Sequence, residues 1–106
     1  MVYTLSELRQ KLTPIAEKHQ LETIYVFGSY AREDVTEDSD IDLLVDASGS
    51  GLVGWDFGGL YEDLKLALKK DIDMITTDAL SDYERDIDKE FSHTVLNERV
   101  AVYERT

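Results

Sequence analysis

The chain has 106 residues, 23 of them acidic and 11 basic, so its formal net charge is −12, and it contains no cysteine. This length predicts one domain over residues 1–106 with a single core, and the lack of cysteine excludes disulfides and thiolate metal sites. The negative charge argues against stable nucleic-acid binding, because basic side chains supply most of that affinity, and it favours a basic protein as partner.

The first half of the sequence predicts a helix followed by two strands. Residues 4–7 (TLSE) match a helix-starting capping box, and apolar residues then recur at helical spacing as far as Ala16. Pro14 lies inside this pattern and predicts a kink or a restart, because proline lacks a backbone donor. Residues 23–27 (TIYVF) and 40–46 (DIDLLVD) are rich in β-branched and apolar residues, which predicts two strands.

The second half continues the alternation of helix and strand. Residues 56–70 place leucines on one helical face, and residues 72–76 (IDMIT) predict a third strand. Residues 81–84 (SDYE) match another capping box, before a helix with apolar residues from Tyr83 to Val95 at spacing four. Residues 100–103 add a final short strand. The sequence therefore predicts an α/β fold with three or four strands.

Five of the six glycines fall in residues 49–59, which we interpret as an ordinary connection between a strand and a helix. Its aromatic residues, Trp55 and Phe57, either anchor the loop to the core or are exposed for contact with a partner. No apolar run approaches the roughly 20 residues that span a bilayer, and the N-terminus lacks a secretion-signal pattern. We therefore expect a cytoplasmic protein that does not engage membranes.

Residues 26–43 carry the pattern that points to chemistry. A strand that ends in Gly28-Ser29 and runs directly into a helical turn brings backbone N–H groups and a hydroxyl close to an anion, which predicts a phosphate seat. Asp40 and Asp42 are two apart on the next strand, so both carboxylates share one face. Two adjacent carboxylates repel each other unless a cation neutralises them, and all-oxygen ligands suit Mg²⁺ or Mn²⁺.

A third carboxylate is expected from the strand at residues 72–76. Asp73 has apolar neighbours, and an adjacent strand would bring it beside the first pair; Asp71 has the same strand parity, and we interpret it as a surface residue. Three carboxylates beside a phosphate seat predict two-metal phosphoryl transfer, in which the ions activate a hydroxyl and stabilise the leaving pyrophosphate. Arg32 either contacts phosphate or pairs with acidic neighbours, and the sequence leaves both open.

The sequence resembles a known family on these residues. Gly28-Ser29, the Ala31-Arg32 pair, and Ser39-Asp40-Ile41-Asp42-Leu43 at this spacing are similar to the signature of polymerase-β-type nucleotidyltransferases, specifically the minimal nucleotidyltransferases (MNT domains). The resemblance implies a small mixed sheet with flanking helices. It also implies that Gly28, Ser29 and Arg32 bind the nucleotide, while Asp40, Asp42 and Asp73 form the catalytic, metal-binding set.

The resemblance also implies a partner. Many MNT proteins are antitoxins encoded beside a HEPN-domain toxin, and some transfer AMP from ATP to a tyrosine of that toxin. We therefore expect a Mg²⁺-dependent enzyme, with two ions, that moves a nucleoside monophosphate from ATP or another nucleoside triphosphate to a hydroxyl of a HEPN toxin. Larger relatives hold the acceptor on an extra helical domain, so here the acceptor site is expected to be shallow, supplied by a partner, or formed in a homo-oligomer or hetero-oligomer.

One position departs from the family pattern. Glu33 stands where the family commonly has glycine after the Ala-Arg pair. A positive φ at this position would strain the turn, and an added carboxylate would weaken triphosphate binding. The departure favours an alternative in which the chain is a non-catalytic acidic module that neutralises a basic partner by occlusion.

Overall fold

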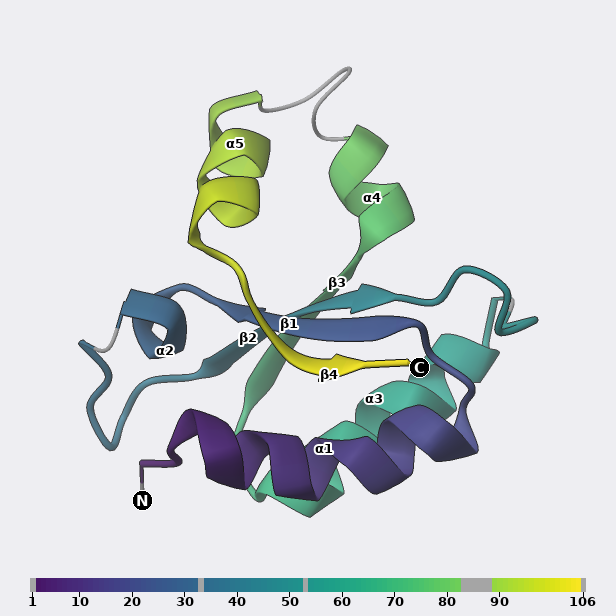
Figure 1. Cartoon of the computed structure of the whole chain (residues 1–106), viewed down its shortest axis with the longest axis horizontal. Coiled ribbons are helices and arrows are strands. Elements are labelled where there is room, and N and C mark those ends of the chain that lie inside the picture. The colour runs from purple at the N-terminus through teal and green to yellow at the C-terminus, as the bar shows by residue number, and fades with distance from the viewer. Residues whose placement is uncertain (1, 33, 53, 83–88, 106) are drawn as a thin grey trace.

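The computed structural model describes residues 2–32, 34–52, 54–82 and 89–105 (Figure 1). One sheet contains the strands β1 (Thr23–Phe27), β2 (Ile41–Asp46), β3 (Ile72–Thr76) and β4 (Val100–Glu104) in the order β3-β2-β1-β4. The pair β2–β3 is parallel, and β1 is antiparallel to both β2 and β4. The α/β class and the mixed sheet are therefore confirmed.

The helices cover both faces of this sheet. α1 (Leu5–Lys18) and α3 (Asp56–Leu68) lie against one face, whereas α4 (Thr77–Asp82) and α5 (Lys89–Glu98) stand over the other (Figure 1). Alternate residues of a strand point to opposite faces, so the core is divided by the sheet rather than single as predicted. The larger cluster includes Leu8, Leu12, Ile24, Val26, Leu43, Leu60 and Leu64, and the smaller one is formed by Leu44, Leu80 and Val95.

Helix α1 begins as its sequence predicts. Thr4 Oγ1 accepts a hydrogen bond from Glu7 N at 3.1 Å, and Glu7 Oε1 accepts one from Thr4 N at 2.9 Å, which completes the capping box. The predicted restart at Pro14 is wrong, because the helix is continuous through it. Pro14 and Gln10 both lie on the exposed side of α1, where the carbonyl group that proline leaves without a helical donor can be hydrated.

Later helix boundaries differ from the sequence prediction. α4 begins at Thr77, directly after β3, and the Thr76 hydroxyl accepts a hydrogen bond from Ala79 N at 3.1 Å. The predicted cap at Ser81 is wrong, because this residue already lies within α4, while Tyr83 and Glu84 lie outside the described residues. α3 ends at Leu68, two residues early, because Lys69 adopts a left-handed conformation with φ +53°.

The glycine-rich segment does connect a strand to a helix. Its two aromatic residues differ in environment: Phe57 packs against the larger core, whereas Trp55 is 91% exposed. None of the helices in the described part of the chain is long and apolar enough to cross a membrane.

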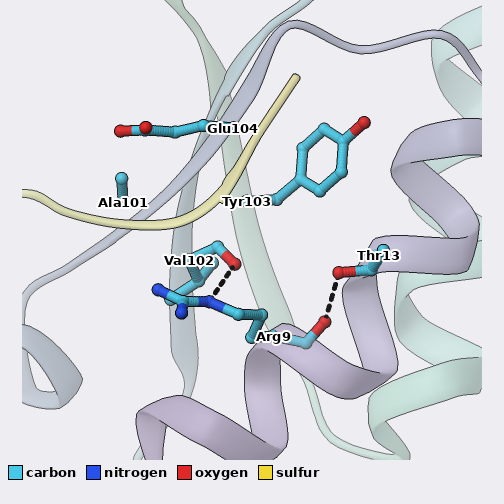
Figure 2. A pocket seen from close by; sticks show the side chains of 6 residues that line it. All are labelled: Arg9, Thr13, Ala101, Val102, Tyr103 and Glu104. Carbon is cyan, nitrogen blue, oxygen red and sulfur yellow. Dashed lines mark hydrogen bonds between the residues drawn. The ribbon is translucent and has the colours of Figure 1, made fainter. Parts of the chain in front are cut away.

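The β4 edge of the sheet is partly closed by α1. The β1–β4 register shifts between Ile24 and Tyr25, which leaves Val102 without a cross-strand partner. The Val102 side chain enters the larger core, and its carbonyl oxygen accepts a hydrogen bond from Arg9 Nε at 3.2 Å (Figure 2). A groove of about 440 Å³ follows this edge between α1 and β4. Arg9 thus satisfies the carbonyl of a bulge residue that the ladder leaves unpaired.

Candidate active site

The carboxylates predicted to act together meet at the centre of the sheet. In the parallel pair β2–β3, Asp42 lies opposite Asp73, and in the antiparallel pair β1–β2 it lies opposite Phe27. Directly opposed residues share a face, so these three side chains project toward the side of the sheet that carries α4 and α5. Asp40 precedes the first residue of β2 and is exposed.

The environment of Asp42 disfavours its charged form. The pKa of this carboxyl group is raised to about 6, chiefly by burial and then by the charge of the neighbouring Asp73 and a hydrogen bond with it. The charge of Asp40 adds to the effect, whereas Arg32 opposes it. A cation bound here would favour the charged form of Asp42 and so offset the cost of burying that charge. Oxygen atoms are the ligands that Mg²⁺ prefers. The Asp42–Asp73 pair therefore fits a divalent metal ion.

Asp40 stands slightly apart from this pair. Within the ranges that the structure describes, no three His, Cys, Asp or Glu side chains are grouped closely enough to hold a metal ion. Asp40 is near enough to influence Asp42 by its charge. The structure thus brings Asp42 and Asp73 together and leaves Asp40 at the margin, so a metal-ligand role for all three stays a prediction.

Gly28 lies directly against the Asp42 carboxylate. Its φ is +70°, a region that side chains with a Cβ atom rarely adopt, and α2 (Ser29–Arg32) begins at the next residue. A Cβ atom at this position would overlap Asp42 Oδ2, well inside contact distance. Glycine is therefore required at this position for two reasons. It adopts the backbone conformation of the turn, and it leaves room for the Asp42 carboxylate, which packs directly against the predicted phosphate seat.

Arg32 pairs with acidic side chains in this structure. Its Nη1 lies 3.0 Å from Glu98 Oε2 of α5, and its Nε lies 3.3 Å from Asp34 Oδ2. The first contact ties the end of α2 to the end of α5. Of the two interpretations that the sequence allowed for Arg32, the ion pair is the one observed, and the contact with phosphate stays a prediction. Glu33, the departure from the family pattern, lies outside the described residues.

The alternative third carboxylate is directed elsewhere. Asp71 precedes β3, its side chain is 79% exposed, and it faces Lys65 at 3.7 Å. Asp73 is the one in register with Asp42. The structure therefore places Asp73, rather than Asp71, beside Asp42, and the role of Asp73 as the third carboxylate stays a prediction.

A hollow beside the carboxylates was not predicted from the sequence. It has a volume of about 260 Å³ and is lined by Phe27, Asp42, Asp73, Met74, Ile75 and Phe91. Phe91 belongs to the apolar series at spacing four, which is typical of a core position, but its side chain is 37% exposed. Strand alternation could have placed Phe27 on the same face as Asp42; the contribution of α5 has no local signal, because it depends on how that helix packs on the sheet.

Comparison with known proteins agrees with this geometry. The sequence matches the family described as "Polymerase beta, Nucleotidyltransferase" over residues 10–106. The chain belongs to the polymerase-β nucleotidyltransferase family. A candidate protein adenylyltransferase of Methanocaldococcus jannaschii is 35% identical to it over 98 residues, which cover 92% of this chain and 97% of that protein.

Two solved structures extend the comparison. One, a minimal nucleotidyltransferase, is 29% identical with a TM-score of 0.64, and the match covers 87% of this chain and 86% of that one. The other is a complex of an MNT antitoxin with a tri-AMPylated HEPN toxin of Shewanella oneidensis; the match is 21% identical with a TM-score of 0.63 and covers 95% and 73% of the two chains. At this lower identity the likeness shows the fold alone.

Membership of the family gives the site its chemical context. Polymerase-β nucleotidyltransferases generally use divalent metals, and the desolvated Asp42 beside Asp73 is a setting that favours a cation. The chain is thus a nucleotidyltransferase whose carboxylate pair and glycine turn meet at one end of β1 and β2.

Proposed function

We propose that this nucleotidyltransferase transfers AMP from ATP to a hydroxyl of a partner protein, requires Mg²⁺, and acts in the cytoplasm as the antitoxin of a HEPN-type toxin. The observation that carries the proposal is the meeting of three features: Asp42 in register with Asp73, the packing of Gly28 against Asp42, and the α2 turn that begins at Ser29. A pair of carboxylates against a tight glycine turn is suited to a metal–triphosphate complex.

Each site residue has a distinct role in this proposal. Gly28 and Ser29 hold the triphosphate, Arg32 neutralises part of its charge, and the carboxylates of Asp42 and Asp73, with Asp40, hold Mg²⁺ or Mn²⁺. When bound, two such ions supply the positive charge that lowers the cost of attack by a hydroxyl and of pyrophosphate departure. The acceptor oxygen forms a bond to the α-phosphorus, the bond from that phosphorus to the bridging oxygen breaks, and pyrophosphate leaves. The acceptor proton passes to water.

The relatives support the nucleotide and the partner. The archaeal relative is named as a candidate protein adenylyltransferase, and the solved complex joins an MNT antitoxin to an AMPylated HEPN toxin. The net charge of −12 suits association with a basic protein surface. In this proposal the acceptor hydroxyl is supplied by that partner protein.

The test is transfer of label from [α-³²P]ATP to the cognate HEPN protein in the presence of Mg²⁺. The Asp40→Asn, Asp42→Asn double variant should transfer nothing while still forming the complex. Asp71→Asn is the matched control, because it removes an exposed carboxylate near β3 that faces Lys65, and it should transfer normally. If the wild-type protein binds the partner and transfers no label, the proposed activity is wrong and the chain acts by occlusion.

A further inference from the structure

Helix α3 turns one face away from the sheet. Its exposed residues recur at helical spacing and are Trp55, Gly58, Gly59, Glu62, Lys65, Leu66 and Lys69. We call this surface the outer α3 face. Trp55 precedes the first residue of α3 but shares its backbone conformation, with φ −68° and ψ −14°. Leu60, Leu64 and Leu68, on the opposite side of the helix, are buried in the larger core.

Two large apolar side chains lie on the outer α3 face. Trp55 is 91% exposed and Leu66 is 69% exposed, which makes them the two most exposed large apolar residues in the described part of the chain. Large apolar groups gathered on one exposed face are typical of a protein interface, and tryptophan is enriched there. Next to Trp55 the helix surface is bare, because a Cβ atom added at Gly58 or Gly59 would meet nothing within 4 Å.

A recess lies at the C-terminal end of this face. It has a volume of about 580 Å³ and is lined by Glu62, Lys65, Leu66, Lys69, Lys70 and Asp71. The lysines surround Leu66 with aliphatic stems and carry their charges at the rim. Such walls suit an indole ring, whose faces are apolar and attract cations. Trp55, the single tryptophan of the sequence, lies at the opposite end of the same face.

The charge of the outer α3 face differs from that of the whole chain. Its exposed residues include one acidic side chain, Glu62, and two basic ones, Lys65 and Lys69, whereas the chain carries −12. A basic partner, which the net charge favours, gains no electrostatic attraction at this face. A second copy of the face placed antiparallel is complementary instead, because Glu62 of each copy comes within one helical turn of Lys65 of the other.

We propose that two copies of this chain associate through their outer α3 faces, antiparallel, with Trp55 of each copy in the recess of the other. Trp55 and Lys69 are equally far from Glu62 along the chain, so a two-fold axis near Glu62 places Trp55 opposite Lys69 of the second copy. The same axis places Leu66 opposite Gly58, where the helix surface is bare. Because the projecting group and the recess lie on one surface, the contact closes as a dimer.

This dimer keeps the candidate active sites away from the contact. α3 lies against one face of the sheet, whereas Asp42 and Asp73 project toward the face that carries α4 and α5 (Figure 1). Each copy therefore presents its carboxylates on the side opposite its neighbour. The inference goes beyond the proposed function and does not depend on it, since it concerns the other face of the sheet.

The single tryptophan makes this contact directly measurable. Concentration is varied from about 1 to 500 µM, a range that brackets the affinity expected of a small interface formed by one helix face. Fluorescence of Trp55 should shift to shorter wavelength as concentration rises, because the indole leaves water. Sedimentation equilibrium should show the mass rising from that of one chain to that of two over the same range.

Three variants test the arrangement. Leu66→Asp should weaken association at least about tenfold, because it buries a carboxylate in the contact. The Gly58→Gln, Gly59→Gln double variant should change two measurements in opposite directions: in dilute solution its urea midpoint rises, since glutamine favours a helix more than glycine does, while association weakens because the bare surface is filled. Leu96→Ala is the matched control, because this residue is 38% exposed on α5, and it should associate as the wild type does.

Three results would overturn the inference. One is a wild-type chain that stays monomeric, with unshifted Trp55 emission, throughout the concentration range. Another is association that Leu66→Asp and the glycine double variant leave unchanged, which would assign the dimer to a different surface. The third is a monomeric wild type whose binding to a HEPN protein is lost in Leu66→Asp, which would assign the face to that partner. Transfer of AMP is tested separately through Asp42, so its failure would not bear on the dimer.

Discussion

Replacement of Gly28 by alanine is the sharpest test of the site geometry. Two separate costs apply at this position: the backbone has φ +70°, and an added Cβ atom would overlap Asp42 Oδ2. Gly51 provides a control for the first cost alone, because its φ is +79° and a Cβ atom there would meet nothing within 4 Å. Comparison of the two alanine variants therefore isolates the contact with Asp42.

The expected magnitudes follow from these two terms. A left-handed backbone costs a residue with a Cβ atom about 1–2 kcal/mol, so Gly51→Ala should lower the free energy of unfolding by about that amount. Gly28→Ala carries the same cost plus about 1–3 kcal/mol for forcing a packed side chain to move. Because the displaced group is the Asp42 carboxylate, Gly28→Ala should also abolish Mg²⁺–ATP binding, which Gly51→Ala should retain.

Urea unfolding of both variants and of the wild type gives the stability difference, and calorimetry gives ATP binding. A double-mutant cycle sharpens the assignment: in an Asp42→Ala background, Gly28→Ala should cost no more than Gly51→Ala, because the overlapping atom is gone. Equal destabilisation by the two glycine replacements in the wild-type background would refute the packing of Gly28 on Asp42.

Three further predictions concern charges around the site and the sheet edge. The raised pKa of Asp42, about 6 against an ordinary 3.8, means that the folded state holds the proton more tightly. In metal-free buffer the stability contributed by this group is therefore complete below about pH 4 and lost as the pH rises through 6, and Asp42→Asn should flatten that dependence in urea unfolding. Glu98→Gln should lower the KM for ATP about threefold, because it frees Arg32 and removes an anion, while the loss of this exposed ion pair should leave the urea-unfolding midpoint close to that of the wild type; a raised KM would show instead that Glu98 orients Arg32. Arg9→Ala should cost about 1 kcal/mol and promote concentration-dependent association in sedimentation runs, because the Val102 carbonyl at the sheet edge loses its donor; unchanged sedimentation would contradict this.

Strand positions were predictable because they depend on short local patterns. The runs at 23–27 and 72–76 form strands over the same residues, and β2 begins one residue after the predicted start at Asp40. The start of α4 was missed because this six-residue helix follows β3 without an intervening turn, so the capping hydroxyl of Thr76 belongs to the strand. A helical pattern can be recognised only over several turns of sequence. It therefore cannot show where a strand ends when a short helix follows it directly.

The site was predictable only as a set of residues. Local spacing identified Gly28, Asp42 and Asp73 as candidates, but the pairing of Asp42 with Asp73 depends on the parallel register of two strands separated by α3. Likewise, helical spacing shows which side chains of α5 share a face and not what that face meets. Val95 meets the smaller core, whereas Phe91, four residues earlier, borders the hollow.

Gly28 and Asp42, which are each unfavourable for folding, lie in direct contact. Glycine at position 28 costs chain entropy, and the Asp42 carboxylate is partly buried beside a second carboxylate, where its charge is disfavoured. Replacing Asp42 by a neutral side chain of similar size would relieve the electrostatic penalty, and the close approach of Gly28 to this carboxylate adds a second need for glycine to the one that its positive φ already imposes. Local conflicts with stability concentrate where function requires them. The contact between Gly28 and Asp42 therefore supports a site for a cation and an anionic ligand more strongly than either residue does alone.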